Sequence, residues 1–267
     1  MTSEQEHVWE GSMPEAYDSL LGEVIFAPHA LDLAKRVMAN PCGDVLELAA
    51  GTGILTRRLL DVVPASRITA TDVNGAMVEF GAARLPEAAW CRADAMDLPF
   101  EDDSFDVVVC QFGIMFFPDK RRALRESARV LRPGGHLLFN TWDCVERNDF
   151  TAALLVGLNQ AFPDDPPTFF TRVPHGYFDV ASVRTDVIAG GFEIDEMTTV
   201  TLESRAPSAA DVAAGFCLGT PIRMFIRERG DLDETTQIVA RTMTTQLGEG
   251  PISGRLSAHV VTAHRRN

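Results

Sequence analysis

The chain has 267 residues, of which 46% are hydrophobic and 23% charged, with 38 acidic against 24 basic side chains and a net charge of −14. This length and apolar fraction exclude wholesale disorder and allow one domain with a large core. The acidic balance disfavours a nucleic-acid partner, because phosphate binding needs clustered Lys and Arg.

Cysteine usage and the absence of long apolar runs predict a cytoplasmic protein. Residues 1–10 are polar and acidic, which predicts no signal peptide, and no apolar run reaches the roughly 20 residues of a membrane span. The cysteines form no Cys-x-x-Cys pair, so we expect buried thiols in a reducing compartment and no metal site. These cysteines are Cys42, Cys91, Cys110, Cys144 and Cys217.

The first 143 residues begin with helices and continue as alternating strands and helices. Residues 1–40 have helical spacing, interrupted at Pro14 and Pro28. Short apolar runs then alternate with helical stretches, which predicts right-handed crossovers and a mostly parallel sheet. The expected strands are 45–48, 67–71, 89–92, 105–111 and 136–141. The expected helices are 52–63, 75–85 and 120–131, and Pro133-Gly134-Gly135 is an expected turn.

Beyond residue 143 the alternation lapses and then returns. Prolines and aromatic residues are interspersed over 144–180, which predicts a cap or insertion. A helix over 181–189 precedes a long strand over 192–203, and a last strand is expected over 255–264. Residues 208–248 are helical, with breaks at Gly219-Thr220-Pro221 and at Gly230.

A glycine turn follows the first expected strand and points to a nucleoside-containing ligand. Gly51 and Gly53 allow a tight turn and leave room for a ligand, at which the next helix directs its N-terminal amides. Asp72 ends the second strand, where a carboxylate can accept both hydroxyls of a ribose. A dinucleotide is disfavoured, because Thr56 occupies the position of the third glycine in the G-x-G-x-x-G pattern.

Five segments in order resemble the class I S-adenosylmethionine-dependent methyltransferases, and the closest group is the ubiquinone/menaquinone-biosynthesis type. They are Glu47-Leu-Ala-Ala-Gly-Thr-Gly53, Thr71-Asp72-Val73-Asn74, residues 92–100, residues 104–109 and residues 131–136. The resemblance implies an α/β fold, a doubly wound, mostly parallel seven-stranded sheet with a late antiparallel strand and helical cap segments. We expect one domain over 1–267, with its core at 41–143, 181–206 and 254–267 and caps at 1–40, 144–180 and 207–253.

The resemblance also implies roles for individual residues around S-adenosylmethionine. Glu47 and the backbone at Ala49 and Gly51 would hold the methionine end, next to Gly53, and Asp72 would bind the ribose. Val73 and Met77 would enclose adenine, with Asp94 and Ala95 at its edge. Gln111 and Phe112 would reach the amino group and sulfonium, and Tyr17 and Phe26 would close over them. Ala49 departs from the family, which often has glycine there.

The acceptor is predicted to be a small, largely apolar or aromatic metabolite, because aromatic residues gather in the cap segments. Alignment and exclusion of water can carry methyl transfer, so a general base is needed only for some acceptors, such as hydroxyls. His175 is the candidate base and His29 its rival, with a core or capping role as the alternative for each. An S-adenosylmethionine-binding module without methyl transfer and a nicotinamide-dependent oxidoreductase stay open as alternative functions.

Overall fold

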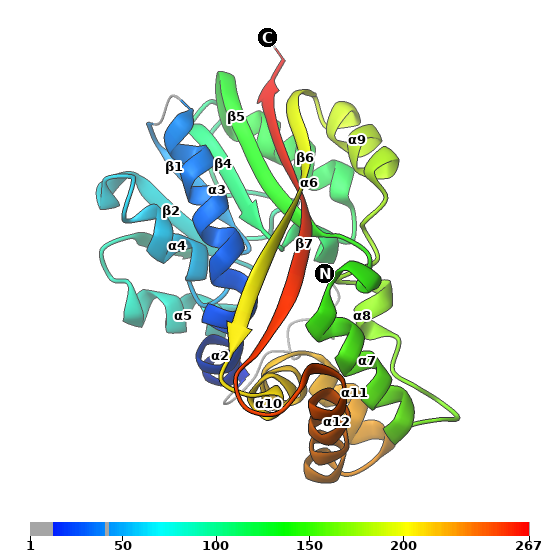
Figure 1. The fold of residues 1–267 in the computed structure, drawn as a ribbon. Helices are drawn as coiled ribbons and strands as arrows, with labels where there is room; N and C mark the ends of the chain where they lie inside the picture. The colour runs from blue at the N-terminus through cyan, green and yellow to red at the C-terminus, as the bar shows by residue number, and fades with distance from the viewer. Residues whose placement is uncertain (1–12, 41–42, 267) are drawn as a thin grey trace.

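The computed structural model describes residues 13–40 and 43–266, so Cys42 and the expectations for residues 1–12 lie outside the described residues. A seven-stranded sheet crosses the molecule with the strand order β3-β2-β1-β4-β5-β7-β6 (Figure 1). The strands are β1 (Val45–Leu48), β2 (Ile68–Asp72), β3 (Ala89–Arg92), β4 (Phe105–Gln111), β5 (Leu131–Trp142), β6 (Phe192–Ala206) and β7 (Ile252–Arg265).

The predicted sheet is confirmed, including its one antiparallel strand. β1 to β5 pair in parallel, whereas β7 runs antiparallel to both β5 and β6. The expected turn at residues 133–135 is a bulge inside β5, because Leu131 already pairs with Phe105 and the regular ladder resumes where His136 pairs with Val107. β5 is therefore longer than the predicted 136–141.

Helices cover both faces of the sheet, and β4 shows why. Its successive side chains alternate between faces, and all of them are apolar around the middle of the strand. Val107 and Val109 pack against α3 and α4, while Val108 and Cys110 belong to the core on the opposite face. The helices that precede β5 in the described chain are α2 (Met13–Tyr17), the π-helix η1 (Asp18–Phe26), α3 (Ala27–Ala39), α4 (Ile54–Leu59), η2 (Ala65–Arg67), α5 (Gly75–Arg84), η3 (Ile114–Phe116) and α6 (Lys120–Val130).

A helical cap lies at the carboxyl end of the parallel strands. The cap is attached to a ribbon of two strands, β6 and β7. The ribbon is two-stranded because β7 pairs with β5 only from Ala258 onward and with β6 alone before that point (Figure 1). The predicted breaks in 208–248 separate α10, α11 and α12, but the helix α7 within 144–180 was not predicted. The later helices are η4 (Val145–Arg147), α7 (Asp149–Ala161), α8 (Phe169–Arg172), α9 (Val180–Ala189), α10 (Ala209–Gly219), α11 (Ile222–Arg229) and α12 (Leu232–Leu247).

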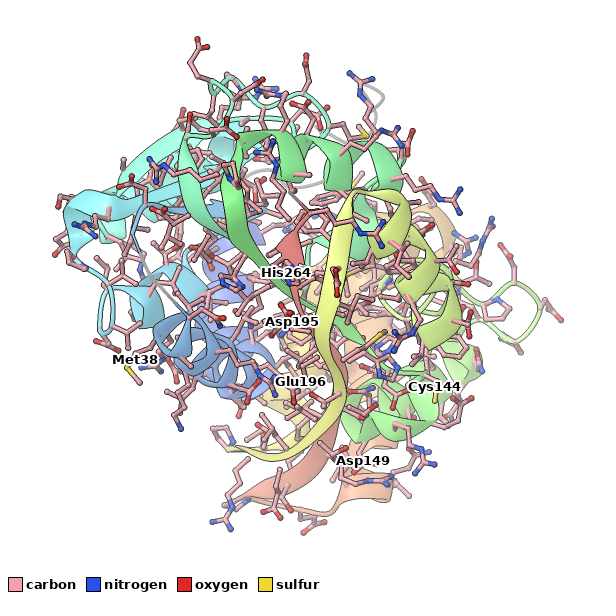
Figure 2. The ribbon with its side chains drawn as sticks, turned by 90° about the horizontal axis from the view of Figure 1, so that it is seen from above. Met38, Cys144, Asp149, Asp195, Glu196 and His264 are labelled. Atoms are coloured by element: carbon pink, nitrogen blue, oxygen red, sulfur yellow. The ribbon has the colours of Figure 1, made fainter. Side chains whose placement is uncertain are left out.

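Polar contacts at the surface involve the ribbon of β6 and β7. Nη1 of Arg36 in α3 lies 2.8 Å from a carboxylate oxygen of Glu196 in β6, and within the ribbon His264 Nδ1 of β7 lies 2.7 Å from Asp195 of β6 (Figure 2). Exposed pairs of this kind contribute at most about 1 kcal/mol each. Burial of apolar side chains therefore has to supply most of the attachment.

Candidate functional site

The turn between β1 and α4 has three residues in the left-handed region. Ala49, Gly51 and Gly53 have φ angles of 52°, 56° and 88°. A Cβ on Gly51 would have no atom within 4 Å, whereas a Cβ on Gly53 would lie 2.8 Å from Leu85 Cδ1. Gly51 thus opens space at the turn, while Gly53 allows the turn to pack on the protein. Ala49 has a methyl group where this backbone favours glycine.

Glu47 extends from β1 as a buried carboxyl group. It is 1% exposed, and its Oε2 accepts a hydrogen bond of 2.6 Å from the Thr56 hydroxyl. Burial, with a smaller contribution from the negative charge of Asp72, raises the pKa of Glu47 to about 8, although the Thr56 bond opposes the shift. Glu47 is therefore mostly protonated at neutral pH in the unliganded protein.

Asp72 is fixed at the end of β2 by backbone donors on two sides. The amides of Gly51 and Asn74 each donate to one of its carboxylate oxygens at 2.9 Å. Burial raises the pKa of Asp72, and these amide bonds oppose the rise. The carboxylate keeps lone pairs for further donors, as ribose recognition requires.

These groups line an outer cleft of about 960 Å³, including its mouth. Ten of the expected binding residues lie in its wall: Tyr17, Phe26, Glu47, Ala49, Gly51, Asp72, Val73, Met77, Gln111 and Phe112. The other lining residues are Ala50, Thr52, Ile54, Leu55, Asn74, Gly113, Phe116 and Phe117. The sequence analysis missed six of these eight as binding residues, and it counted Phe116 and Phe117 only among the aromatic residues that suit an apolar acceptor.

Three of the expected binding residues do not line the outer cleft. Gly53 faces the protein instead, since a Cβ there would meet Leu85 and Trp90. Asp94 Oδ1 accepts a bond of 2.9 Å from the Met96 amide, and Ala95 is buried. Their local contacts are those of a loop turn.

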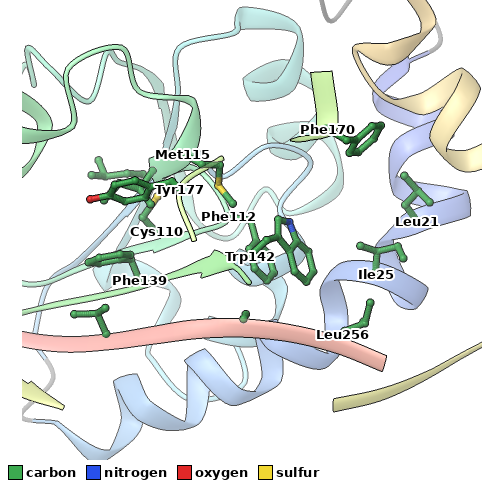
Figure 3. Close-up of a cluster of buried hydrophobic side chains, with 14 of the residues drawn as sticks. Leu21, Ile25, Cys110, Phe112, Met115, Phe139, Trp142, Phe170, Tyr177 and Leu256 are labelled. Atoms are coloured by element: carbon green, nitrogen blue, oxygen red, sulfur yellow. The ribbon is translucent and has the colours of Figure 1, made fainter. Parts of the chain in front are cut away.

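Aromatic rings close the cleft on its inner side. The Tyr17 and Phe26 rings stack with centroids 4.7 Å apart, and the Gln111 side-chain amide donates to the Phe26 carbonyl at 2.8 Å. Phe112 has a φ of 49° and stacks on Trp142 with a centroid distance of 3.6 Å (Figure 3). The N-terminal segment is thereby held against the carboxyl end of β4.

Behind this wall lies an inner cavity of about 610 Å³. It shares Tyr17, Phe26, Phe112 and Phe116 with the outer cleft, so these four residues lie where the two spaces adjoin. The remaining lining residues are Ile25, Trp142, Asn148, Thr151, Phe169, Phe170, Pro174, His175, Phe216, Thr220, Pro221 and Leu256. Four aromatic residues of the segments expected to form the cap line neither space: Phe162, Tyr177, Phe178 and Phe225.

The two candidate histidines lie in different surroundings. His175 lines the inner cavity, and its Nδ1 lies 2.7 Å from the Asp143 carbonyl oxygen. His29 is fully buried, lies perpendicular to the stacked rings of Phe112 and Trp142 and lines neither space, so it is a core histidine. Burial lowers the pKa of each to about 4, and the carbonyl contacts partly oppose the shift.

Neither a metal cluster nor a single membrane-spanning helix is present in the described ranges. Among residues 13–40 and 43–266, no group of three or more His, Cys, Asp or Glu side chains could hold a metal ion. In that same part of the chain no single helix is long and apolar enough to cross a membrane. α10 and α11 pass such a test only as a pair, which is bent by 85°.

Comparison with known proteins identifies a methyltransferase domain. Residues 46–139 match the family described as a methyltransferase domain. A ubiquinone/menaquinone biosynthesis C-methyltransferase of Ectopseudomonas mendocina is 41% identical over 106 residues, which are 37% of this chain and 41% of the relative. A demethylmenaquinone methyltransferase of Thermotoga maritima is 43% identical over 129 residues, which are 46% of this chain and 56% of the relative.

The match to these curated relatives thus spans between two fifths and somewhat more than half of their length. Among solved structures, the [4+2]-cyclase SpnF has a TM-score of 0.63 at 17% identity, covering 98% of this chain and 95% of its own. At this identity the similarity shows the fold alone. The resemblance to class I S-adenosylmethionine-dependent methyltransferases is confirmed, which makes S-adenosylmethionine the cofactor to test against the site.

The outer cleft fits this cofactor on two independent grounds. The Thr52 hydroxyl and the Gln111 Oε1 are buried and have no hydrogen-bond partner among the described residues, and both side chains line the cleft. Such atoms are costly unless a ligand pairs with them, as the polar methionine end would. The open space at Gly51 and the carboxylate of Asp72 fit the ribose side.

Proposed function

We propose that this chain, which carries a methyltransferase domain over residues 46–139, transfers a methyl group from S-adenosylmethionine to a small, largely apolar or aromatic metabolite. One observation carries the proposal. A cleft with a ribose-type carboxylate and unpaired polar atoms shares a wall of aromatic rings with a second, mainly apolar cavity. This arrangement brings a nucleoside ligand and an apolar molecule to the two sides of one wall.

The lining of the outer cleft supports the following cofactor contacts. Glu47, Thr52 and Gln111 would hold the methionine end, with the backbone at Ala49 and Gly51. Asp72 would accept the ribose hydroxyls, and Val73 and Met77 would flank adenine. Asp94 and Ala95 lie outside the cleft lining, so their contact with the adenine edge stays a prediction. When bound, the cofactor supplies an electrophilic methyl group on a positively charged sulfur.

The chain itself contributes alignment and exclusion of water. Holding two reactants in a reactive geometry can lower a barrier by several kcal/mol without a dedicated catalytic side chain. The rings of Tyr17, Phe26, Phe112 and Phe116 lie at the boundary and present apolar surface to both spaces. We expect them to exclude water from the path between donor and acceptor.

The cellular setting that suits this proposal is the cytoplasm. Cys91, Cys110, Cys144 and Cys217 are free thiols, and thiols persist in reducing compartments. The net charge of −14 favours a small-molecule acceptor over nucleic acid.

Asp72→Ala tests the cofactor assignment. We expect S-adenosylhomocysteine, measured by isothermal titration calorimetry, to bind at least tenfold more weakly, because a charge-assisted bond worth about 1.5–3 kcal/mol is lost. Asp61→Ala is the matched control, since it removes an exposed carboxylate outside the cleft. Unchanged affinity in Asp72→Ala would show that the acid of β2 was misassigned.

Two further measurements separate methyl transfer from the alternatives. S-adenosylhomocysteine should raise the unfolding temperature and NAD(H) should not, because only a ligand of the native state stabilises it. The reverse result would support the nicotinamide-dependent oxidoreductase. Labelled methyl groups should pass from the cofactor to an apolar metabolite of an extract. Cofactor binding with no methyl incorporation would indicate a binding module.

A further inference from the structure

A row of three polar side chains on the ribbon of β6 and β7 lies outside both cavities. Thr199 of β6 and His259 of β7 pair directly across the ribbon, and Thr199 Oγ1 lies 2.9 Å from His259 Nδ1. His259 Nε2 lies 3.4 Å from a carboxylate oxygen of Asp143, which follows the end of β5. These three residues line neither the outer cleft nor the inner cavity, so the proposed methyl transfer does not use them.

The carboxylate decides which nitrogen of His259 carries the hydrogen. A carboxylate oxygen can only accept, so in the neutral ring the hydrogen lies on Nε2, which is near Asp143. Nδ1 then has the lone pair, and the Thr199 hydroxyl donates to it. The three groups therefore follow the order hydroxyl, imidazole and carboxylate, in which the imidazole can act as a general base on the hydroxyl.

Asp143 is held in place as an ionised carboxylate. One of its oxygens accepts from the Cys144 amide at 2.7 Å, and the other accepts from the Ser257 hydroxyl at 2.9 Å. Burial acts to raise the pKa of Asp143, but these two bonds and the neighbouring His259 lower it overall. A carboxylate held in this way orients the imidazole and stabilises its protonated form.

The Thr199 hydroxyl is accessible, whereas the groups behind it are shielded. Thr199 is exposed, while His259 is only 5% exposed and Asp143 is partly buried. Thr201, two residues further along the same face of β6, is also exposed, but its hydroxyl donates to the Ser257 hydroxyl at 3.2 Å. Thr199 thus differs from this neighbour by having a base as its hydrogen-bond partner.

The free edge of β6 offers backbone donors near Thr199. β6 is the last strand of the sheet, and among the described residues its amides make no hydrogen bond outside the ladder with β7. Alternate amides of an edge strand point away from the neighbouring strand. Such amides can bond the oxygen on which negative charge develops when a hydroxyl attacks a carbonyl group.

We propose that Thr199 is the nucleophile of another site on this chain, which hydrolyses small activated esters with His259 as its general base. This activity goes beyond the proposed methyl transfer and does not need S-adenosylmethionine. Asp143 acts there as a positioning residue, because it contacts the imidazole and not the ester.

The reaction needs only the ester and water. The Thr199 proton moves to Nδ1 of His259, and the Thr199 oxygen bonds the carbonyl carbon of the ester. The bond from this carbon to the leaving oxygen then breaks, and the leaving oxygen takes the proton from His259. A water molecule next gives a proton to Nδ1 and attacks the acyl group. The Thr199 oxygen leaves with that proton, which restores the hydroxyl and releases a carboxylic acid.

Hydrolysis of p-nitrophenyl acetate tests the inference. We expect the unmutated chain to release nitrophenolate at least about tenfold faster than Thr199→Val, which retains the shape of the side chain and removes the hydroxyl. Thr199→Ser should retain the activity, because it retains a hydroxyl. Thr201→Val is the matched control and should hydrolyse the ester at the rate of the unmutated chain, since Ser257 still donates to Asp143. Saturating S-adenosylhomocysteine should not slow the reaction, because the site lies outside the outer cleft.

Mass spectrometry of the acid-quenched reaction locates the covalent step. In the unmutated chain an acetyl group should be found on Thr199, and in Asp143→Asn at least about fivefold less of it, because the imidazole loses the carboxylate that orients it. The measurement on the unmutated chain needs no variant, so it decides the question even if Thr199→Val does not fold. Equal hydrolysis by the unmutated chain and Thr199→Val, or acetyl groups only on other residues, would overturn the inference. The contact between Thr199 and His259 would then only join the two strands of the ribbon.

Discussion

Glu47→Gln should remove a pH dependence that the buried carboxyl of β1 imposes on stability. The pKa of Glu47 rises from 4.5 to about 8 because the side chain is 1% exposed. A raised pKa in the folded state gives stability that is fully present below pH 4.5 and is lost as the pH rises through 8. The complete loss is roughly 5 kcal/mol, at 1.36 kcal/mol per unit of pKa difference.

The substitution retains the shape of the side chain and removes its charge. Between pH 5 and 9 the unmutated chain should lose about 4 kcal/mol of unfolding free energy relative to Glu47→Gln, with the two proteins most similar at the acidic end. The amide oxygen introduced by Glu47→Gln can still accept the bond from the Thr56 hydroxyl, so that contact does not account for the difference.

Urea denaturation at pH 5, 7 and 9, followed by circular dichroism, measures this difference. Glu79→Gln, which neutralises an exposed carboxyl of α5, is the matched control and should parallel the unmutated chain at every pH. If the gap between the unmutated chain and Glu47→Gln stayed constant within about 1 kcal/mol over this range, burial of Glu47 would not govern its protonation.

Four further substitutions test other parts of the structure. Gly51→Ala and Gly134→Ala both place a methyl group at a positive φ with no atom within 4 Å, so each should lower the free energy of unfolding by about 1 kcal/mol, measured by thermal unfolding. Only Gly51→Ala, which lies in the cleft, should weaken the binding of S-adenosylhomocysteine. Equally weakened binding in both variants would contradict this prediction. Gly81→Ala should lower the free energy of unfolding, measured by urea denaturation, by about 1–3 kcal/mol, because its Cβ would lie 2.2 Å from the Trp90 ring. An unchanged free energy of unfolding would show that the Trp90 ring does not pack against Gly81. His29→Phe should reduce the loss of unfolding free energy at acidic pH. The lowered pKa of His29 gives stability that is present above pH 6.5 and is lost as the pH falls through about 4, by roughly 3 kcal/mol. An unchanged dependence of the unfolding free energy on pH below 6.5 would refute this.

The sequence by itself determined the strands, their alternation with helices and the position of the carboxylate in the outer cleft. A run such as Val107–Val109 predicts a strand buried on both faces, and the end of β2 places Asp72 beside the glycine turn. The strands depend on neighbours within a few residues, so local pattern carries them, whereas Gly51 and Asp72 are 21 residues apart and meet because β1 and β2 pair in parallel. The start of β5 was missed because Pro133-Gly134-Gly135 has turn chemistry whether the chain turns or bulges.

Only the tertiary structure decided which residues share a cavity. Gly51 and Gly53 have the same local pattern, yet one faces open space and the other faces Leu85. The inner cavity joins side chains as distant as Ile25 and Leu256, and no spacing rule connects them. The His175 ring likewise contacts a carbonyl that is 32 residues away in the sequence. Contacts of this kind result from packing of the cap on the sheet, which a linear pattern does not encode.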